Sequence, residues 1–132
     1  MAASQRFLPA QAYTDPRIHH WDCSGYAQRY WHPLTAGSAL PAGHCLALTL
    51  LDQPLLLTRA EDGTPRAFLN RCPHRGVAFR HERDGATACR RLICPYHGWT
   101  YSLEGELLAA AREQGFDLSL IHISEPTRQP CI

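Results

Sequence analysis

The sequence predicts an all-β fold, namely a small antiparallel β-sandwich preceded by a short N-terminal helical arm. Three apolar runs of strand length, 44–51, 54–59 and 65–70, follow one another with turn residues between them. Ahead of them, Thr14-Asp15-Pro16 has the composition of a helix start, an N-cap residue followed by proline in the first turn. The chain has 132 residues, which is enough for one domain with a modest core.

The N-terminal arm is assigned to residues 1–31. Residues 1–12 are expected to be extended, and apolar side chains then follow a loose helical period to the end of the arm, weakened at Gly25. His19 and His20 are adjacent in the sequence, so they cannot share one face of a helix. We therefore interpret both as surface histidines and not as ligands.

The β-sandwich is assigned to residues 32–117. Glu61-Asp62-Gly63 is a hairpin turn in which glycine supplies a positive φ. After the third apolar run the chain is expected to form a short hairpin with its tip at Arg83-Asp84-Gly85. The strand segments expected after that run are 77–80, 89–93, 98–102 and 107–108.

Two short motifs carry the chemistry of the chain, CPHRG at 72–76 and CPYHGW at 94–99. A proline after each cysteine fixes the backbone, and Gly76 and Gly98 let it turn with positive φ. Two cysteines and two histidines on two loops suit a [2Fe–2S] cluster in which imidazoles replace the thiolates on one iron. The candidate ligands are Cys72, His74, Cys94 and His97.

A structural zinc site is the alternative for these four residues. Zinc also accepts two cysteines and two histidines. Zinc-binding sequences more often contain C-x-x-C or H-x-x-x-H pairs than C-x-H followed by C-x-x-H. The spacing therefore favours the iron–sulfur interpretation.

The two motifs resemble the Rieske motif in the alpha subunits of ring-hydroxylating oxygenases, and the resemblance extends over about residues 8–117. It implies that Cys72 and Cys94 hold the inner iron, and that His74 and His97 hold the outer, solvent-facing iron. Respiratory Rieske proteins carry an additional cysteine beside each ligand pair. This chain has other residues near those places, which disfavours that class.

The same resemblance implies a role in electron transfer. Members of that family receive electrons from a ferredoxin or reductase. His97 would pass them, through a carboxylate of a neighbouring subunit, to a mononuclear Fe(II) site, so a homo-oligomer is expected for the full-length subunit. That iron is held by two histidines and one carboxylate in a second, larger domain, and no such triad is visible in this sequence.

The chain is therefore predicted to be the electron-transfer part of an oxygenase that performs no oxygenation by itself. A free-standing Rieske ferredoxin is the alternative. Residues 13–31 favour the oxygenase, because a ferredoxin of this kind normally begins near its first strand.

The last stretch, residues 118–132, departs from the preceding pattern. Reverse-translated, residues 118–128 resemble a transposase-end adapter used in sequencing libraries. We expect the stretch to be unstructured read-through and the genuine protein sequence to be truncated near Asp117. A reading frame that continues past Asp117 in the source genome would favour the oxygenase, and a stop codon there would favour the ferredoxin.

Charge and apolar content limit the partners and the location. The net charge of +1 gives no electrostatic case for a nucleic-acid or membrane partner. The N-terminus lacks the pattern of a secretory signal, and the longest apolar run, 45–51, is too short to span a bilayer. A cytoplasmic location is expected. The remaining cysteines are interpreted as buried apolar or merely tolerated residues without an assigned role: Cys23, Cys45, Cys89 and Cys131.

One local charge pattern is distinct from that overall balance. Residues 71–91 contain six arginines and two carboxylates, a local net charge of +4. Opposite charges speed the encounter of redox partners, so this segment is predicted to dock an acidic electron donor. The arginines are Arg71, Arg75, Arg80, Arg83, Arg90 and Arg91.

Overall fold

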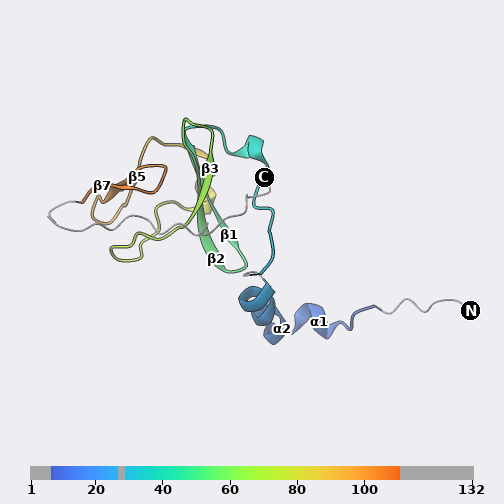
Figure 1. Ribbon diagram of the computed structural model, residues 1–132. Helices are drawn as coiled ribbons and strands as arrows, with labels where there is room; N and C mark the ends of the chain where they lie inside the picture. Colours follow the sequence, from blue (N-terminus) through green and yellow to red (C-terminus); the bar gives the residue numbers. More distant parts are fainter. Residues whose placement is uncertain (1–6, 27–28, 111–132) are drawn as a thin grey trace, which may run out of the picture. The chain divides into compact units, whose positions relative to one another are not determined.

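The computed structural model describes residues 7–26 and 29–110 (Figure 1). The chain divides into two compact units between His32 and Pro33. The predicted read-through tail, residues 118–132, lies outside the described residues. Within the described part, no helix has the length and apolar character needed to cross a membrane.

The N-terminal unit contains short helices, namely α1 (Gln11–Thr14), α2 (Pro16–Trp21) and a π-helical turn (Asp22–Tyr26). The predicted helix start is confirmed: Asp15 is the N-cap of α2, its carboxylate accepts the Arg17 amide at 2.8 Å, and Pro16 occupies the first turn. The prediction that residues 1–12 are extended is wrong for the last of them, because α1 begins at Gln11. His19 and His20 are exposed, as predicted.

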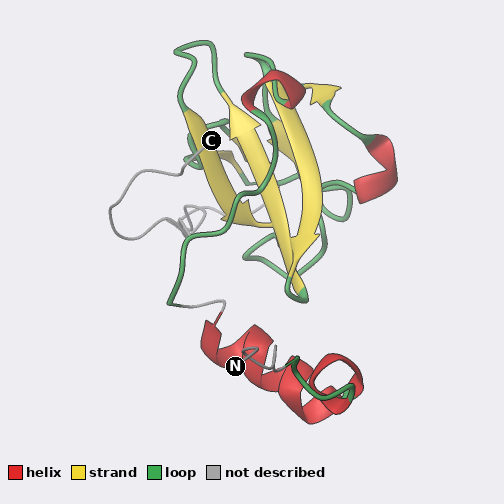
Figure 2. Cartoon of the chain, turned by 90° about the vertical axis from the view of Figure 1, so that its right-hand side faces the viewer, coloured by secondary structure: helices red, strands yellow, loops and turns green. Residues whose placement is uncertain are grey.

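The second unit contains two antiparallel sheets (Figures 1 and 2). The three apolar runs form a meander, as predicted, and a fourth short strand extends it to give the order β3-β2-β1-β4. The other sheet has the order β5-β6-β7. The strands are β1 (His44–Leu50), β2 (Gln53–Arg59), β3 (Pro65–Leu69), β4 (Thr87–Ala88), β5 (Leu92–Ile93), β6 (Thr100–Tyr101) and β7 (Leu107–Ala109).

A single buried cluster contains side chains from both sheets, which confirms the all-β class. Phe68 of β3 and Tyr101 of β6 are fully buried in it. Phe79 packs edge-on against Tyr101, with ring centroids 5.5 Å apart. The buried Thr58 hydroxyl of β2 donates to the Leu103 carbonyl at 2.7 Å, which ties the first sheet to the turn after β6.

The hairpin predicted between 77–80 and 89–93 is wrong. Residues 77–80 form no strand; β4 pairs instead with β1, and β5 pairs with β6. The side chain of Asn70 explains the difference. Its amide oxygen accepts the backbone N–H of Phe79 at 3.0 Å, and its amide nitrogen donates to the Arg80 carbonyl at 2.8 Å. Backbone groups of Phe79 and Arg80 thus have hydrogen-bond partners without a partner strand.

Candidate iron–sulfur site

The two motif loops are built alike. In each, the cysteine amide donates to a carbonyl five residues later, and the glycine amide donates back to the cysteine carbonyl. Both glycines have φ of +71°, a conformation that other residues rarely adopt. The bonds are Cys72 N–H to Val77 (2.8 Å), Gly76 N–H to Cys72 (2.7 Å), Cys94 N–H to Trp99 (2.8 Å) and Gly98 N–H to Cys94 (3.0 Å).

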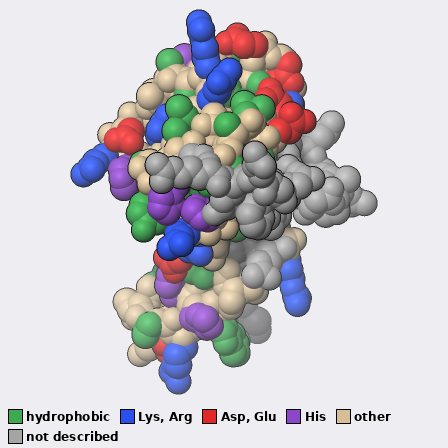
Figure 3. Space-filling view, turned by 90° about the vertical axis from the view of Figure 1, so that its left-hand side faces the viewer, with side chains coloured by type: hydrophobic (Ala, Val, Ile, Leu, Met, Phe, Trp, Pro, Cys, Tyr) green, Lys and Arg blue, Asp and Glu red, His purple; other side chains and the backbone are tan. Residues whose placement is uncertain are grey.

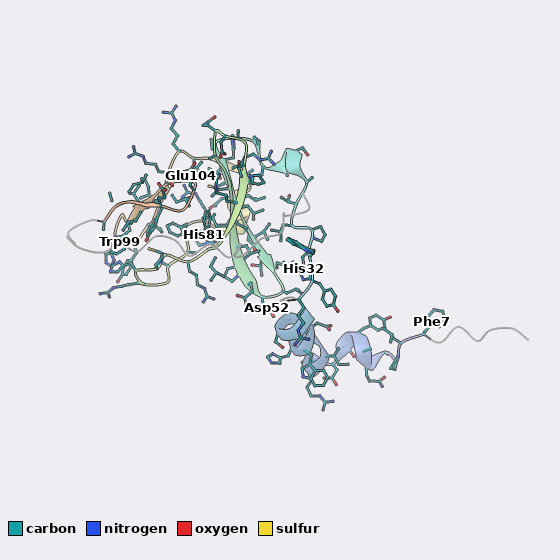
Figure 4. The ribbon with its side chains drawn as sticks, in the orientation of Figure 1. Phe7, His32, Asp52, His81, Trp99 and Glu104 are labelled. Atoms are coloured by element: carbon teal, nitrogen blue, oxygen red, sulfur yellow. The ribbon has the colours of Figure 1, made fainter. Side chains whose placement is uncertain are left out.

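The fold brings the two loop histidines into contact. Nδ1 of His74 lies 3.2 Å from Nδ1 of His97, so each Nε2 lies on the far edge of its ring. The indole of Trp99 stacks on His74, with centroids 4.6 Å apart and planes 6° from parallel. The ring centroid of Tyr96 lies 3.8 Å from the ring centroid of His97. Figure 4 shows Trp99 on the side of the second unit that carries β5.

The two loop cysteines lie deeper than the histidines. Cys72 and Cys94 are each 2% exposed, whereas His74 is half-buried and His97 is exposed. The Tyr101 hydroxyl lies 3.7 Å from Sγ of Cys72. Burial raises the pKa of the Cys72 thiol, and the hydrogen bond from Tyr101 acts in the opposite direction. A metal ion would therefore have to displace a proton from this sulfur.

This donor set fits a cluster with two kinds of ligand. The sulfurs are buried, where thiolates are kept from solvent, and the paired Nδ1 atoms lie nearer the surface. Two thiolates and two imidazoles are the ligands of a Rieske-type [2Fe–2S] centre. The predicted residues Cys72, His74, Cys94 and His97 are thus brought together at one place, on two similar loops.

Several contacts of the site were not predicted from the sequence. Trp99 and Tyr101 belong to the predicted strand 98–102, and they alternate along it, so they point to the same face. That alternation was a signal that both side chains face inward. It does not reveal that one stacks on His74 and the other reaches Cys72.

Several arginines of residues 71–91 are exposed on the surface. Figure 3 views the side of β5 and β7, where histidine side chains gather with arginines beside them. Arg80 is half-buried and does not belong to this surface. We call the exposed group the arginine rim: Arg71, Arg75, Arg83, Arg90 and Arg91.

Two antiparallel sheets that share a core and carry paired Cys/His loops define a class of small all-β metalloprotein. Residues 30–118 match the family model of the Rieske [2Fe-2S] domain. This match covers more than half of the 132 residues, so the chain belongs to the Rieske [2Fe–2S] domain family, whose cofactor is a [2Fe–2S] cluster.

Subunits of oxygenases are among the proteins similar to this chain. The chain is 36% identical over 114 residues to the glycine betaine monooxygenase oxygenase subunit of Chromohalobacter salexigens, covering 86% of this chain and 25% of that protein. It is 33% identical over 106 residues to toluate 1,2-dioxygenase subunit alpha of Pseudomonas putida, covering 80% and 23%. The chain thus spans about a quarter of the length of these curated relatives.

Solved structures give the same result. The quaternary ammonium Rieske monooxygenase CntA superposes with a TM-score of 0.75 at 26% identity, over 86% of this chain and 33% of that one. Naphthalene 1,2-dioxygenase from Rhodococcus sp. superposes with a TM-score of 0.73 at 27% identity, over 87% and 28%. The fold therefore matches the Rieske part of both monooxygenases and dioxygenases.

Proposed function

We propose that Cys72, His74, Cys94 and His97 hold the [2Fe–2S] cluster and that this chain is the electron-transfer domain of a Rieske oxygenase alpha subunit. The contact between the two Nδ1 atoms beside two buried cysteines carries the proposal, because it presents four donors of the required kinds together. The thiolates would bind the inner iron and the imidazoles the outer iron.

The protein groups around the site have separate tasks in this function. When bound, the cluster supplies one-electron transfer at a potential above that of all-thiolate ferredoxins. Trp99 fixes the plane of His74 by stacking. The Tyr101 hydroxyl lies within hydrogen-bonding distance of the Cys72 sulfur, where donation would offset negative charge. The exposed ring of His97 presents Nε2 on its outer edge, where its N–H can donate a hydrogen bond to a carboxylate of a neighbouring subunit.

The proposed parent protein extends beyond this chain. Its relatives are oxygenase subunits of about four times the matched length. We place a mononuclear Fe(II), held by two histidines and a carboxylate, in that additional part, together with the contacts that make a homo-oligomer. We also place the protein in the cytoplasm, because six cysteines without the pattern of a disulfide framework suit a reducing compartment.

The cofactor assignment is tested by assembling the protein with iron and sulfide. The product is expected to be red-brown, to contain iron and labile sulfide in equal amounts, and to give a Rieske-type EPR signal when reduced. The mixed sulfur and nitrogen donor set is the physical reason. One zinc per chain without labile sulfide would replace the proposal by a structural zinc site.

The arginine rim is proposed to dock an acidic ferredoxin or reductase. Its five arginines are exposed, and two of them, Arg71 and Arg75, flank the first ligand pair in the sequence. Redox complexes bury little area, so charge steering has a large share in their formation. The alternative is a solvated surface whose arginines have no partner protein.

The rate of cluster reduction by the native donor distinguishes these two possibilities. The double variant Arg83→Glu, Arg90→Glu is expected to be reduced several-fold more slowly than wild type at low salt, and the wild-type rate is expected to fall as salt screens the charges. Arg66→Glu is the control, because Arg66 lies at the opposite end of β3 from Cys72 and pairs with Asp62 at 2.9 Å. Rates that respond neither to salt nor to the double substitution would leave the rim without a docking role.

A further inference from the structure

A second pair of cysteines lies in the core, apart from the ligand loops. Cys45 is in β1 and Cys89 directly follows β4. The register pairs Cys45 with Thr87, and the Cys89 amide donates to the Gly43 carbonyl at 2.8 Å. Cys45 and Cys89 are therefore diagonal neighbours on one face of the sheet, where side chains are in reach of each other.

The two thiols interact, and a guanidinium lies beside them. The Cys89 thiol hydrogen-bonds the Cys45 sulfur, and this lowers the pKa of Cys45, with a further contribution from Arg80. The same contact, together with burial, raises the pKa of Cys89. The Nε of Arg80 is buried and has no hydrogen-bond partner among the described residues. Arg80 is half-buried, and its positive charge favours the thiolate form of Cys45.

We propose that Cys45 and Cys89 form a redox-active dithiol, which hydrogen peroxide oxidises to a disulfide between β1 and the segment after β4. Cys45 is fully buried and Cys89 is only 8% exposed, so the oxidant has to be small. The proposal does not rest on the function proposed above, because neither residue is a proposed cluster ligand. The disulfide would tie β4, which pairs with β1 over only two residues, to the central sheet.

The reaction takes place in two steps. The Cys45 thiolate attacks one oxygen of the peroxide, an S–O bond forms, the O–O bond breaks, and the departing hydroxide takes a proton to become water. The Cys89 sulfur then attacks Sγ of the resulting sulfenic acid, the S–S bond forms, and the S–O bond breaks. The second hydroxide takes the Cys89 proton, so two thiols lose two electrons and two protons while peroxide becomes two waters.

Peptide mapping of the cluster-loaded full chain tests this proposal. The protein is treated with hydrogen peroxide in equal amount, remaining thiols are alkylated, and the chain is cleaved after arginine without reduction. The expected product joins peptides 30–59 and 84–90, with two hydrogens fewer than their sum, because each contains one cysteine. It is expected to form before the visible absorbance of the cluster falls, and to disappear with dithiothreitol. Glutathione disulfide is expected to produce no such link, because it is too large to reach Cys45.

Three variants separate the proposed roles. In Cys89→Ser, oxidation is expected to stop at the sulfenic acid of Cys45. Arg80→Gln is expected to form the Cys45–Cys89 disulfide several-fold more slowly, because the thiolate of Cys45 is less favoured without the guanidinium. Arg66→Gln is the control, because it removes another half-buried arginine, one that pairs with Asp62, and it is expected to react like wild type. The proposal would be overturned if Cys45 and Cys89 are both found alkylated after peroxide treatment. It would also be overturned if their disulfide appears only after the cluster is lost. An unchanged rate in folded Arg80→Gln would remove the role of the guanidinium.

Discussion

Cys72→Ser is expected to yield a folded protein without the [2Fe–2S] cluster. Serine is nearly the same size, but its hydroxyl is far harder to deprotonate than a thiol and is a poor ligand for iron–sulfur centres. Cys72 is 2% exposed, so no water can replace the missing sulfur without opening the core. Iron and labile sulfide should fall below a tenth of their wild-type content, about a tenfold loss or more in cluster affinity. The visible absorbance and the EPR signal should disappear together.

Cys89→Ser is the matched control for this experiment. Cys89 belongs to the same buried cluster of side chains and receives the same chemical change, yet it is not a proposed ligand. Circular dichroism of both variants reports whether the sheets still form. A full complement of iron and sulfide in Cys72→Ser would contradict the role of Cys72, and loss of the cluster from both variants would show that serine disturbs the core instead.

The local order of the chain was predictable because short-range chemistry determines it. The Asp15 cap and the meander of β1, β2 and β3 each depend on a few neighbouring residues, and the structure confirms them. The spacing of the two motifs likewise pointed to four residues that the fold brings together. A motif of this kind constrains its own loop strongly, since glycine with φ of +71° leaves few alternatives.

The misplaced elements depend on contacts that are distant in the sequence. Residues 77–80 have a strand-like composition, yet the side chain of Asn70 bonds backbone groups of Phe79 and Arg80, and periodicity carries no information about these bonds. Tyr101 reaches Cys72 across 29 positions, and Cys45 meets Cys89 across 44. Such contacts require knowledge of the sheet order, which local patterns do not supply.

The two histidines are expected to determine the potential of the cluster. A neutral imidazole in place of an anionic thiolate removes negative charge from the site, and this favours the reduced state. Rieske centres lie between about −150 and +300 mV, whereas plant-type ferredoxins with four thiolates lie near −400 mV. Replacing two thiolates by imidazoles therefore raises the reduction potential by at least about 250 mV, and replacing one raises it by roughly 100 mV or more.

His74→Cys is accordingly expected to retain a cluster whose reduction potential is lower than that of wild type by roughly 100 mV or more. His74 stacks on Trp99, so the variant also loses that contact, and Trp99→Leu measures how much the stacking alone changes the potential. His81→Cys is the matched control, because His81 is an exposed histidine in the turn before β4 and not a proposed ligand. Redox titration followed by EPR gives all four potentials. A potential in His74→Cys that is equal to or above the wild-type value would contradict the assignment of His74 to the outer iron.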